Sequence, residues 1–451
     1  MNTKLNINLP KVNIFIILLF NVFILGLFLG PVLINLFILC LFIIYLKEFK
    51  KNNLYLIKNF NLTIKLQFLF CLYIIINAFY IGSEINLFYK SFFYFRFFLI
   101  AFVISQILDI KFETFNFIIL SILLFSVFLG IDIFYQYLFG YDFFGFKPGI
   151  CSYPDGEQNF DQKNCERFSG FFGKELIAGN FLSTYGIMSL YIYFSRFSGL
   201  AYSKLLFLLS FIIIISSIIL SGERNAILAL LIIFFFNILF NNIIRKKLFY
   251  IASLVVVIFV IFFSTVENVR YRYFDWPTKN FNKVSGSMLK KFLHTSWGSH
   301  YLTSYEIFLD NKVFGSGFKS FRIECHKDNY HFDIFNNKYD LNIKTNGCST
   351  HPHNFYLELL SELGLVGFIL FLLILYLIVL HPFIKNFRHI KYDGEIIIIL
   401  SIILTYIVPL KPSGSYSSSI FSSNLWFFIG IYLYLIKNFE YKLKRKIIYK
   451  I

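Results

Sequence analysis

Residues 205–240 read LLFLLSFIIIISSIIL, then SGERN, then AILALLIIFFFNILF. Two apolar runs, 205–220 and 226–240, are therefore separated by a turn of five small or polar residues. A hydrocarbon core about 30 Å thick needs roughly 20 apolar residues in a helix that crosses it. A segment in lipid must satisfy its own backbone hydrogen bonds, and these runs lack the alternation of a barrel strand. The stretch predicts two transmembrane helices joined by a tight turn.

Apolar runs of this kind recur along the whole chain of 451 residues, which is 57% hydrophobic and only 15% charged. A soluble protein with this composition lacks the polar residues needed to cover its surface. We therefore expect an all-α polytopic membrane protein with about twelve transmembrane helices. The predicted spans are 12–29, 31–46, 66–82, 91–108, 115–138, 175–195, 205–220, 226–240, 248–265, 355–380, 395–410 and 420–436.

Clusters of basic residues follow the second, sixth, eighth, tenth and twelfth predicted spans. The positive-inside rule assigns these clusters to the cytoplasmic side, so both termini are expected there. The rule also accounts for much of the formal charge of +17, and no nucleic-acid partner is expected. The clusters are Lys47, Lys50, Lys51 and Lys58; Arg196 and Lys204; Arg245, Lys246 and Lys247; Lys385, Arg388 and Lys391; and Lys442, Lys444, Arg445 and Lys446.

Two segments on the opposite, external side are too long to be simple turns, one at about 139–174 and the other at 266–354. Loops longer than about 15 residues are usually functional or disordered. The second segment is rich in aromatic and charged residues and holds six of the eight histidines, so we expect it to fold. The chain thus divides into spans one to nine at 1–265, this large loop, and three further spans with a basic tail at 355–451.

Four cysteines fall in these two external segments. Cys151 and Cys165 share the first segment, and Cys325 and Cys348 share the second. Two local pairs facing an oxidising compartment predict two disulfides. Four unpaired thiols remain the alternative.

Residues 349–368 read STHPHNFYLELLSELGLVGF. Ser349 or Thr350 is expected to cap a helix that continues into the membrane as span ten. His353 would then sit near the start of that helix, at the external interface. A histidine held there suits general-base catalysis, because its ordinary pKa lies near neutrality. The alternative is an interfacial histidine that only caps the backbone.

Basic residues approach the same interface from two other segments. Arg224 lies in the tight turn between spans seven and eight, where a guanidinium suits phosphate binding through its planar fork of donors. Arg167 and Lys174 add positive charge just before span six. Anchoring to lipid headgroups is the alternative for all three.

Together these stretches resemble the O-antigen ligases and related bacterial glycan polymerases. The signature of that family is a histidine followed by Asn, Gln or Ser, then nine residues, then Gly-x-x-Gly and a Gly, Thr or Tyr. His353 and Asn354 match its start, and Gly364 and Gly367 match its glycines, which we expect on the His353 face of the helix, where they let a neighbouring helix approach. Only Phe368 departs from the signature.

Other positions match the family less specifically. Arg224 matches a Ser-x-x-Arg turn, Arg167 begins an Arg-x-Ser-Gly segment, and residues 315–321 resemble a glycine-rich segment of the long loop. Relatives commonly carry an arginine where this chain has His300, which puts any role of that position in doubt. The nearby arginines that could substitute are Arg270, Arg272 and Arg322.

The resemblance implies a GT-C-like membrane glycosyltransferase of lipopolysaccharide or other polysaccharide biosynthesis. Its donor would be a glycan on polyprenyl (undecaprenyl) diphosphate at the periplasmic face of the inner membrane. The acceptor would be lipid A-core, another glycan or a polypeptide. Arg224, helped by Arg167, would hold the diphosphate, and His353 would deprotonate the acceptor hydroxyl for an inverting displacement. No cofactor or metal is expected.

Three alternatives stay open. A polymerase that joins two lipid-linked repeat units shares the fold and the donor, and the signature does not separate it from a ligase. His351, His353 and His300 could form a zinc site, although no further ligand is identifiable by spacing. A flippase or transporter would carry ionisable groups deep inside its spans, for which Arg96 and Asp132 are the candidates.

Overall fold

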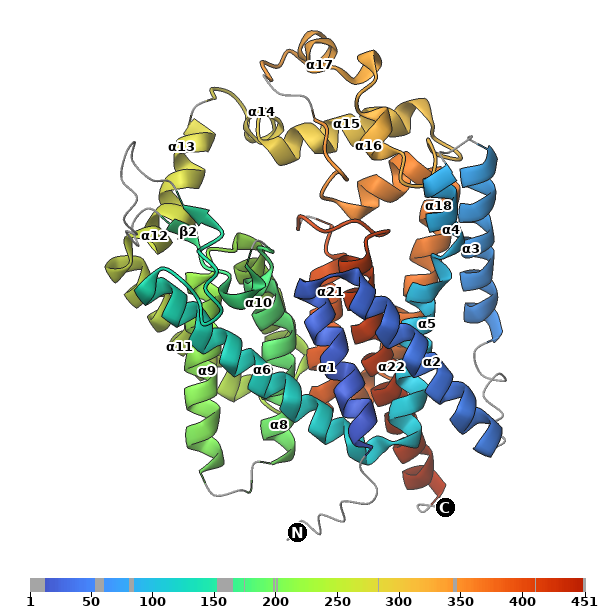
Figure 1. Ribbon diagram of the computed structural model, residues 1–451, viewed down its shortest axis with the longest axis vertical. Helices are drawn as coiled ribbons and strands as arrows, with labels where there is room; N and C mark the ends of the chain where they lie inside the picture. The colour runs from blue at the N-terminus through green and yellow to red at the C-terminus, as the bar shows by residue number, and fades with distance from the viewer. Residues whose placement is uncertain are drawn as a thin grey trace.

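The computed structural model describes residues 13–52, 61–80, 85–151 and 165–448, with the exception of 174, 198, 200–201, 283, 344–346 and 410. These residues form a helical bundle with a single two-stranded hairpin (Figure 1). The bundle consists of α1 (Ile14–Leu29), α2 (Pro31–Asn52), α3 (Asn61–Tyr80), α4 (Ile85–Phe92), α5 (Phe95–Ile110), α6 (Phe112–Phe139), α7 (Ala178–Phe181), the π-helix η4 (Leu182–Gly186), α8 (Ile187–Arg196), α9 (Ser203–Leu220), α10 (Arg224–Phe240), α11 (Arg245–Thr265), α18 (Phe355–Leu375), the π-helix η7 (Tyr376–Leu380), α19 (His381–Lys385), α20 (Phe387–Ile390), α21 (Gly394–Ile407) and α22 (Ser419–Ile448).

The remaining elements belong to the two long segments between spans. The first segment contains β1 (Ile150–Cys151), β2 (Cys165–Arg167) and the 3-10 helix η3 (Gly170–Phe172). The second contains α12 (Glu267–Arg270), the π-helix η5 (Tyr271–Asp275), α13 (Trp276–Asn282), α14 (Met288–Leu293), α15 (Ser296–Asp310), α16 (Phe321–Glu324), the 3-10 helix η6 (Asp328–Tyr330) and α17 (Phe332–Tyr339).

The predicted all-α polytopic fold is confirmed. Among the described residues, eight helical segments are long and apolar enough to cross a membrane. Helices α1, α10 and α21 are apolar but shorter, and the sixth predicted span is the continuous run of α7, η4 and α8. Each of the twelve predicted spans thus contains at least one described helix, while twelve crossings remain a prediction.

The basic turns gather at one end of the bundle. Arg196 after α8 forms an ion pair with Glu395 at the start of α21, with N and O atoms 2.5 Å apart. The backbone N–H of Asn242 after α10 donates to the carbonyl oxygen of Lys391, at 3.0 Å. The start of α1 and the end of α22 lie at this end, and α12–α17 lie at the opposite end, which we call the loop end (Figure 1). The predicted common side of these basic clusters agrees with this arrangement.

Residues with special backbone preferences set several helix ends. Pro31 is the first residue of α2, where its missing N–H costs no helical hydrogen bond. Gly140 ends α6 with φ of 82°, a left-handed conformation that favours glycine. Gly222, with φ of 66°, turns the chain between α9 and α10. The tight turn that the sequence predicts there is therefore built on this glycine.

The large loop 266–354 is folded, as expected. It has a small core of its own, built from Leu302, Ile307, Phe321, Cys325, Tyr330, Phe335 and Ile343. Cys325 and Cys348 are joined by a disulfide, with Cα atoms 5.3 Å apart. In the first segment the backbones of Cys151 and Cys165 pair in the hairpin. Their side chains lie outside the described residues, so that disulfide stays a prediction.

The two charged residues that would mark a transporter lie near the loop end. Asp132, in the last turns of α6, accepts hydrogen bonds from the N–H groups of Phe143 and Phe171 at 2.8 and 2.7 Å. Arg96, at the start of α5, donates to the Ser419 hydroxyl at 3.2 Å. Both side chains therefore fasten neighbouring segments through hydrogen bonds, Asp132 to the chain after α6 and Arg96 to the start of α22.

Candidate active site

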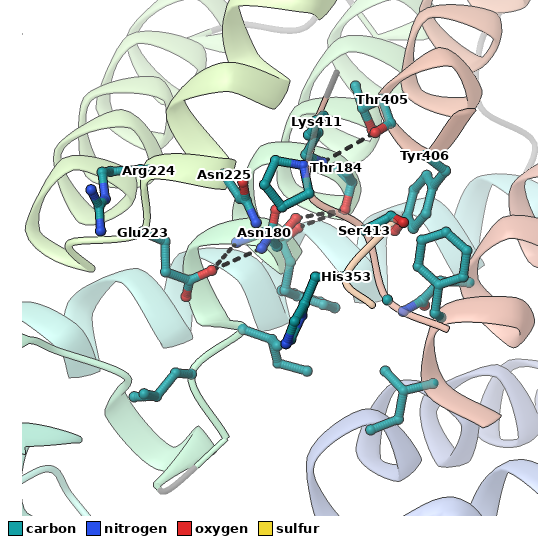
Figure 2. Close-up of a pocket in the computed structure, with 18 of the residues that line it drawn as sticks. Asn180, Thr184, Glu223, Arg224, Asn225, His353, Thr405, Tyr406, Lys411 and Ser413 are labelled. Carbon is teal, nitrogen blue, oxygen red and sulfur yellow. Dashed lines mark hydrogen bonds between the residues drawn. The ribbon is translucent and has the colours of Figure 1, made fainter. Parts of the chain in front are cut away.

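A cavity of about 560 Å³ lies at the loop end of the bundle (Figure 2). His353, Arg224 and Arg167, which the sequence singled out from three separate segments, all line it. The other lining residues are Leu27, Phe172, Leu176, Ile177, Asn180, Phe181, Thr184, Tyr185, Glu223, Asn225, Arg272, Trp297, His351, Thr405, Tyr406, Lys411, Pro412, Ser413, Gly414, Ser418, Ile420, Phe421 and Asn424. Helices α7, η4 and α10 thus face the loop between α21 and α22 across the cavity.

The structure agrees with the predicted start of span ten at 355 but corrects its predicted cap, Ser349 or Thr350. Helix α18 begins at Phe355, and its N-cap is Asn354, whose side-chain oxygen accepts from the N–H groups of Tyr356 and Leu357. His353 therefore precedes the helix and adopts a left-handed backbone with φ of 56°. Its carbonyl oxygen accepts from the Ser413 N–H at 2.8 Å, which ties it to the α21–α22 loop.

The side chain of Asn354 also connects α18 to the loop between α21 and α22. Its side-chain amide donates to the carbonyl oxygen of Pro409 at 2.9 Å, in addition to capping α18. One side chain thus fixes both the helix start and the α21–α22 loop. The Ser413 N–H holds the carbonyl oxygen of His353 and Asn354 fixes the residue after it, while the His353 imidazole faces the cavity (Figure 2).

Two further histidines surround the ring of His353. The ring centre of His351 lies 4.3 Å from it, and that of His300, on α15, lies 5.5 Å from it. Burial, with His300 beside it, lowers the pKa of His353 to about 4. Burial likewise lowers the pKa of His351 to about 3, with His353 as the next cause. Both rings are neutral at pH 7 and retain a lone pair.

The geometry does not favour zinc binding by these histidines. Within the described part of the chain, Cys325, His326 and Cys348 form the one group of three potential ligands whose donor atoms lie within 4.8 Å of one another. Two members of that group are joined in the disulfide. The structure instead places His300 as a packing neighbour of His353.

Arg224 is the first residue of α10, directly after the tight turn. Its guanidinium carbon lies 4.3 Å from the ring centre of Trp276 and 5.8 Å from that of Trp297. Both tryptophans belong to the large loop, so the loop stacks on the faces of this planar cation. A guanidinium binds anions through its edge, and stacking on its faces fixes that edge in place.

Of the three arginines considered as substitutes for a family arginine, Arg272 lines the cavity. Its Nε donates to the carbonyl oxygen of Gly222 at 3.1 Å, and its guanidinium carbon lies 5.5 Å from the Trp276 ring. Arg270 is not part of the lining, and its Nε lies 3.8 Å from a carboxylate oxygen of Asp275. Arg322 donates to the Thr350 carbonyl oxygen at 3.2 Å and is not part of the lining.

Arg167 enters the cavity beside a carboxylate that the sequence reasoning missed. The Arg167 guanidinium donates to the Leu176 carbonyl oxygen at 2.9 Å. The Glu223 carboxylate accepts from the Gly179 N–H at 2.8 Å and from the backbone and side chain of Asn180 at 3.2 and 3.0 Å (Figure 2). Burial raises the pKa of Glu223 to about 7, against the opposing effect of Arg167.

Lys174, the remaining basic candidate, lies outside the described residues. The Ser169–Gly170 pair that follows Arg167 forms a turn, because the N–H groups of Ser169 and Gly170 both donate to the side-chain oxygen of Gln136, at 3.0 and 2.9 Å. Gly170 has φ of 55°, which explains glycine at this position. The turn therefore positions Arg167 against α6.

Lys411 is a second lining residue that the sequence reasoning missed. Its ammonium donates to the Thr405 carbonyl oxygen at 3.1 Å and lies 6.0 Å from the centre of the Tyr406 ring (Figure 2). Burial lowers its pKa to about 8. A lone lysine followed by proline between the last two apolar spans is the signal that could have identified it.

Two carboxylates on α18 hold the loops on either side of His353. Glu358 accepts from the Ser415 hydroxyl at 2.5 Å and from the Tyr416 N–H at 3.0 Å. Glu362 accepts from the Tyr416 hydroxyl at 2.9 Å and from the Lys319 N–H at 2.9 Å. The α21–α22 loop and the glycine-rich segment of the large loop are thereby fastened to the helix that follows His353.

The signature glycines admit close neighbours, but not as one helical face. Gly364 interrupts α18 with φ of 63°, and a Cβ atom there would lie 2.3 Å from the carbonyl oxygen of Val313. A Cβ atom at Gly367 would lie 2.9 Å from the Tyr73 ring of α3. Gly367 therefore admits a neighbouring helix, as expected, whereas Gly364 admits the large loop.

Comparison with known proteins gives one match. Residues 209–372 match the family model described as O-antigen ligase. The matched segment contains Arg224, Arg272 and His353, together with both tryptophans that stack on Arg224. No curated protein matches the chain significantly. This similarity over residues 209–372 supports a relation of this membrane protein to the O-antigen ligase family.

Proposed function

We propose that the protein transfers a glycan from a polyprenyl diphosphate to an acceptor hydroxyl at the periplasmic face of the inner membrane, as an O-antigen ligase. One observation carries this proposal. The lining of a single cavity combines a neutral histidine with Arg224, Arg272 and Arg167. The match of residues 209–372 to the O-antigen ligase family supports the same reaction class.

The arginines suit a diphosphate leaving group. The guanidinium groups of Arg224 and Arg272 both lie over the Trp276 ring. Arg224 directly follows the turn before α10, and Arg272 donates to the Gly222 carbonyl oxygen in that turn. Two preorganised guanidinium groups can donate to diphosphate oxygens and stabilise the charge that builds up as the glycosidic bond breaks. This neutralisation by fixed cations replaces the role that a divalent ion plays elsewhere. We therefore propose a metal-independent reaction.

His353 is the proposed base. Its neutral ring accepts the proton of the acceptor hydroxyl while the acceptor oxygen forms a bond to the anomeric carbon. The bond between that carbon and the diphosphate oxygen breaks, and the polyprenyl diphosphate leaves with the electron pair. Attack from the face opposite the leaving group inverts the anomeric centre. A bound diphosphate favours the charged imidazolium, so the donor itself raises the basicity of His353.

The sidedness follows from charge and redox chemistry. The basic turns at the end opposite the loop end are expected in the cytoplasm. The loop end, with the cavity and the Cys325–Cys348 disulfide, then faces the periplasm, where disulfides persist. A lipid-linked donor would reach the cavity from the outer leaflet.

The test is glycan transfer by the purified protein in liposomes that contain a polyprenyl-diphosphate-linked glycan and a candidate acceptor. Transfer that persists after exhaustive chelation supports the proposal, and transfer restored only by one added metal contradicts its metal-independent part. A deletion strain separates ligase from polymerase. A ligase deletion leaves normal-length polymer on its lipid carrier, whereas loss of a polymerase leaves single repeat units.

A further inference from the structure

The side chain of Asn180 is fixed at its amide nitrogen and open at its oxygen. The nitrogen donates to a carboxylate oxygen of Glu223 at 3.0 Å, and the backbone N–H of Asn180 donates to the same oxygen at 3.2 Å. Because the nitrogen faces Glu223, the side-chain oxygen Oδ1 points away from that carboxylate. Among the described residues no group donates to Oδ1, and this atom is not buried. Asn180 lines the cavity, so Oδ1 is an acceptor that a ligand there can use.

The backbone around Asn180 holds this acceptor in place. The Asn180 carbonyl oxygen accepts from the hydroxyl groups of Ser183 and Thr184, at 3.0 and 2.8 Å. Gly179 packs against the tight turn before α10, where a Cβ atom on it would collide with the Ser221 side chain. Helix α7 and this turn are therefore packed directly together, which limits the motion of Asn180.

Asn180 lies where the proposed reaction places the sugar of the donor. In Figure 2, Asn180 lies between the Glu223–Arg224 turn and the His353 ring, and all four residues line the cavity. If the proposed function holds, the diphosphate binds at Arg224 and the acceptor hydroxyl binds at His353. The anomeric carbon is bonded to the diphosphate and attacked by the acceptor, so it lies between these two residues. The sugar atoms nearest to Asn180 are therefore those around the anomeric carbon.

The sugar offers a hydrogen-bond donor on only one side of its anomeric carbon. In an aldose, that carbon is bonded to the ring oxygen, to the leaving oxygen and to the adjacent ring carbon, C-2. Both oxygens lack a hydrogen atom and can only accept. The substituent on C-2 is commonly a hydroxyl or an acetamido group, which offers an O–H or an N–H donor. An acceptor beside the anomeric carbon is therefore matched to the substituent on C-2.

We propose that Oδ1 of Asn180 accepts a hydrogen bond from the C-2 hydroxyl or acetamido group of the sugar attached to the diphosphate. This inference rests on the proposed function and specifies its donor. Positive charge builds up on the anomeric carbon as its bond to the diphosphate breaks, and this charge makes the C-2 group a stronger hydrogen-bond donor. Hydrogen bonds at this position strengthen in the transition state of glycoside hydrolysis, where similar charge develops. The contact therefore favours turnover as well as binding.

A purely structural role for Asn180 would be to hold the Glu223 carboxylate. That carboxylate already accepts from the backbone N–H groups of Gly179 and Asn180. The side chain of Asn180 adds a third hydrogen bond to a group that the backbone holds. The structural contact uses the amide nitrogen and the sugar contact uses the oxygen, so variants can separate them.

The test uses three polyprenyl diphosphate donors with the full-length protein in liposomes. They differ only at C-2 of the sugar attached to the diphosphate, which is glucose, 2-acetamido-2-deoxyglucose or 2-deoxyglucose. The C-2 preference is the kcat/KM of the hydroxyl or the acetamido donor divided by that of the 2-deoxy donor. The C-2 group also changes the intrinsic reactivity of the anomeric carbon, but this effect is the same for every variant. A change in the preference between variants therefore reports on the protein.

Variants then assign the preference to this residue. Asn180→Ala should lower the hydroxyl or the acetamido preference at least about fivefold, and the preference that falls identifies the group that Oδ1 contacts. Asn180→Ser, which shortens the side chain, replaces the alanine variant if that variant does not insert. Asn180→Asp keeps an acceptor oxygen but loses the donor to Glu223, so it should retain the preference even if all rates fall.

Asn116→Ala is the matched control. Asn116 is also an asparagine bonded to a charged side chain, because its side-chain oxygen accepts from Arg196 at 2.6 Å. It lies at the opposite end of the bundle and does not line the cavity. Its replacement should leave both C-2 preferences unchanged.

Two results overturn the inference. Asn180→Ala could lower the turnover of all three donors equally, as a purely structural role requires. Asn180→Asp could also lose the C-2 preference together with the alanine variant, which would assign the preference to the contact with Glu223. In either case the proposed glycan transfer still stands. Absence of transfer from every lipid-linked donor by the wild-type protein would instead contradict the proposed function itself.

Discussion

Replacement of Arg224 by lysine tests whether the stacked guanidinium binds the diphosphate. Arg224→Lys keeps the positive charge but removes the planar fork and the stacking on Trp276 and Trp297. One lost hydrogen bond to a charged group costs about 1.5–3 kcal/mol. Loss of the contact with the tryptophan rings costs about a further 0.5–2 kcal/mol. The two together predict that kcat/KM falls about 30- to 5,000-fold.

The assay is initial-rate glycan transfer from a purified lipid-linked donor, with donor concentration varied so that kcat and KM separate. If the guanidinium stabilises the departing diphosphate, kcat falls as well as kcat/KM. Arg270→Lys is the control, since Arg270 lies in the same segment as Arg272 but pairs with Asp275 outside the cavity. A lysine variant of Arg224 with wild-type kinetics would refute the reasoning and leave Arg224 as a headgroup anchor.

Three further perturbations follow from the geometry. Glu358→Ala removes the acceptor of the buried Tyr416 N–H and one of two partners of the Ser415 hydroxyl, so it should lower the free energy of unfolding by about 1–3 kcal/mol. Glu358→Gln should lose less, and identical unfolding of the alanine variant and the wild type in detergent would contradict this. Reduction of the Cys325–Cys348 disulfide should destabilise the large loop by about 3 kcal/mol, and non-reducing peptide mapping should find the bond; free thiols there would contradict it. Because burial lowers the pKa of His353 to about 4, kcat/KM should stay constant as pH falls through 6 and should decline only near that pKa. The decline of kcat should come at higher pH, since bound diphosphate raises the pKa of His353. A decline of kcat/KM centred at about pH 6.5 would argue against a buried base.

The bundle was predictable because membrane spans are encoded locally. Apolar length marks each helix, and α2 begins at Pro31, where the second predicted span begins. The cap of α18 was not predictable in the same way. Ser349, Thr350 and Asn354 have similar capping preferences, and the choice between them depends on tertiary contacts.

The Asn354 side chain makes such a tertiary contact, because its amide donates to the Pro409 carbonyl oxygen in a distant loop. The same limit applies to the site. The histidine and the arginines were found because their local patterns are distinctive. Glu223 and Lys411 gain their significance only from burial in a shared cavity, which depends on helices far apart in the sequence. The stacking of Trp276 on Arg224 likewise requires the fold of the large loop.

Turnover by His353→Ala on a purified polyprenyl-diphosphate-linked glycan tests the central claim most directly. The alanine variant should insert, fold and bind the donor, because the backbone contacts of His353 and the arginine group remain. Loss of the base should lower kcat by about 10²- to 10⁴-fold. An alanine variant with near-wild-type kcat on that donor would contradict the assignment of His353 as the catalytic base.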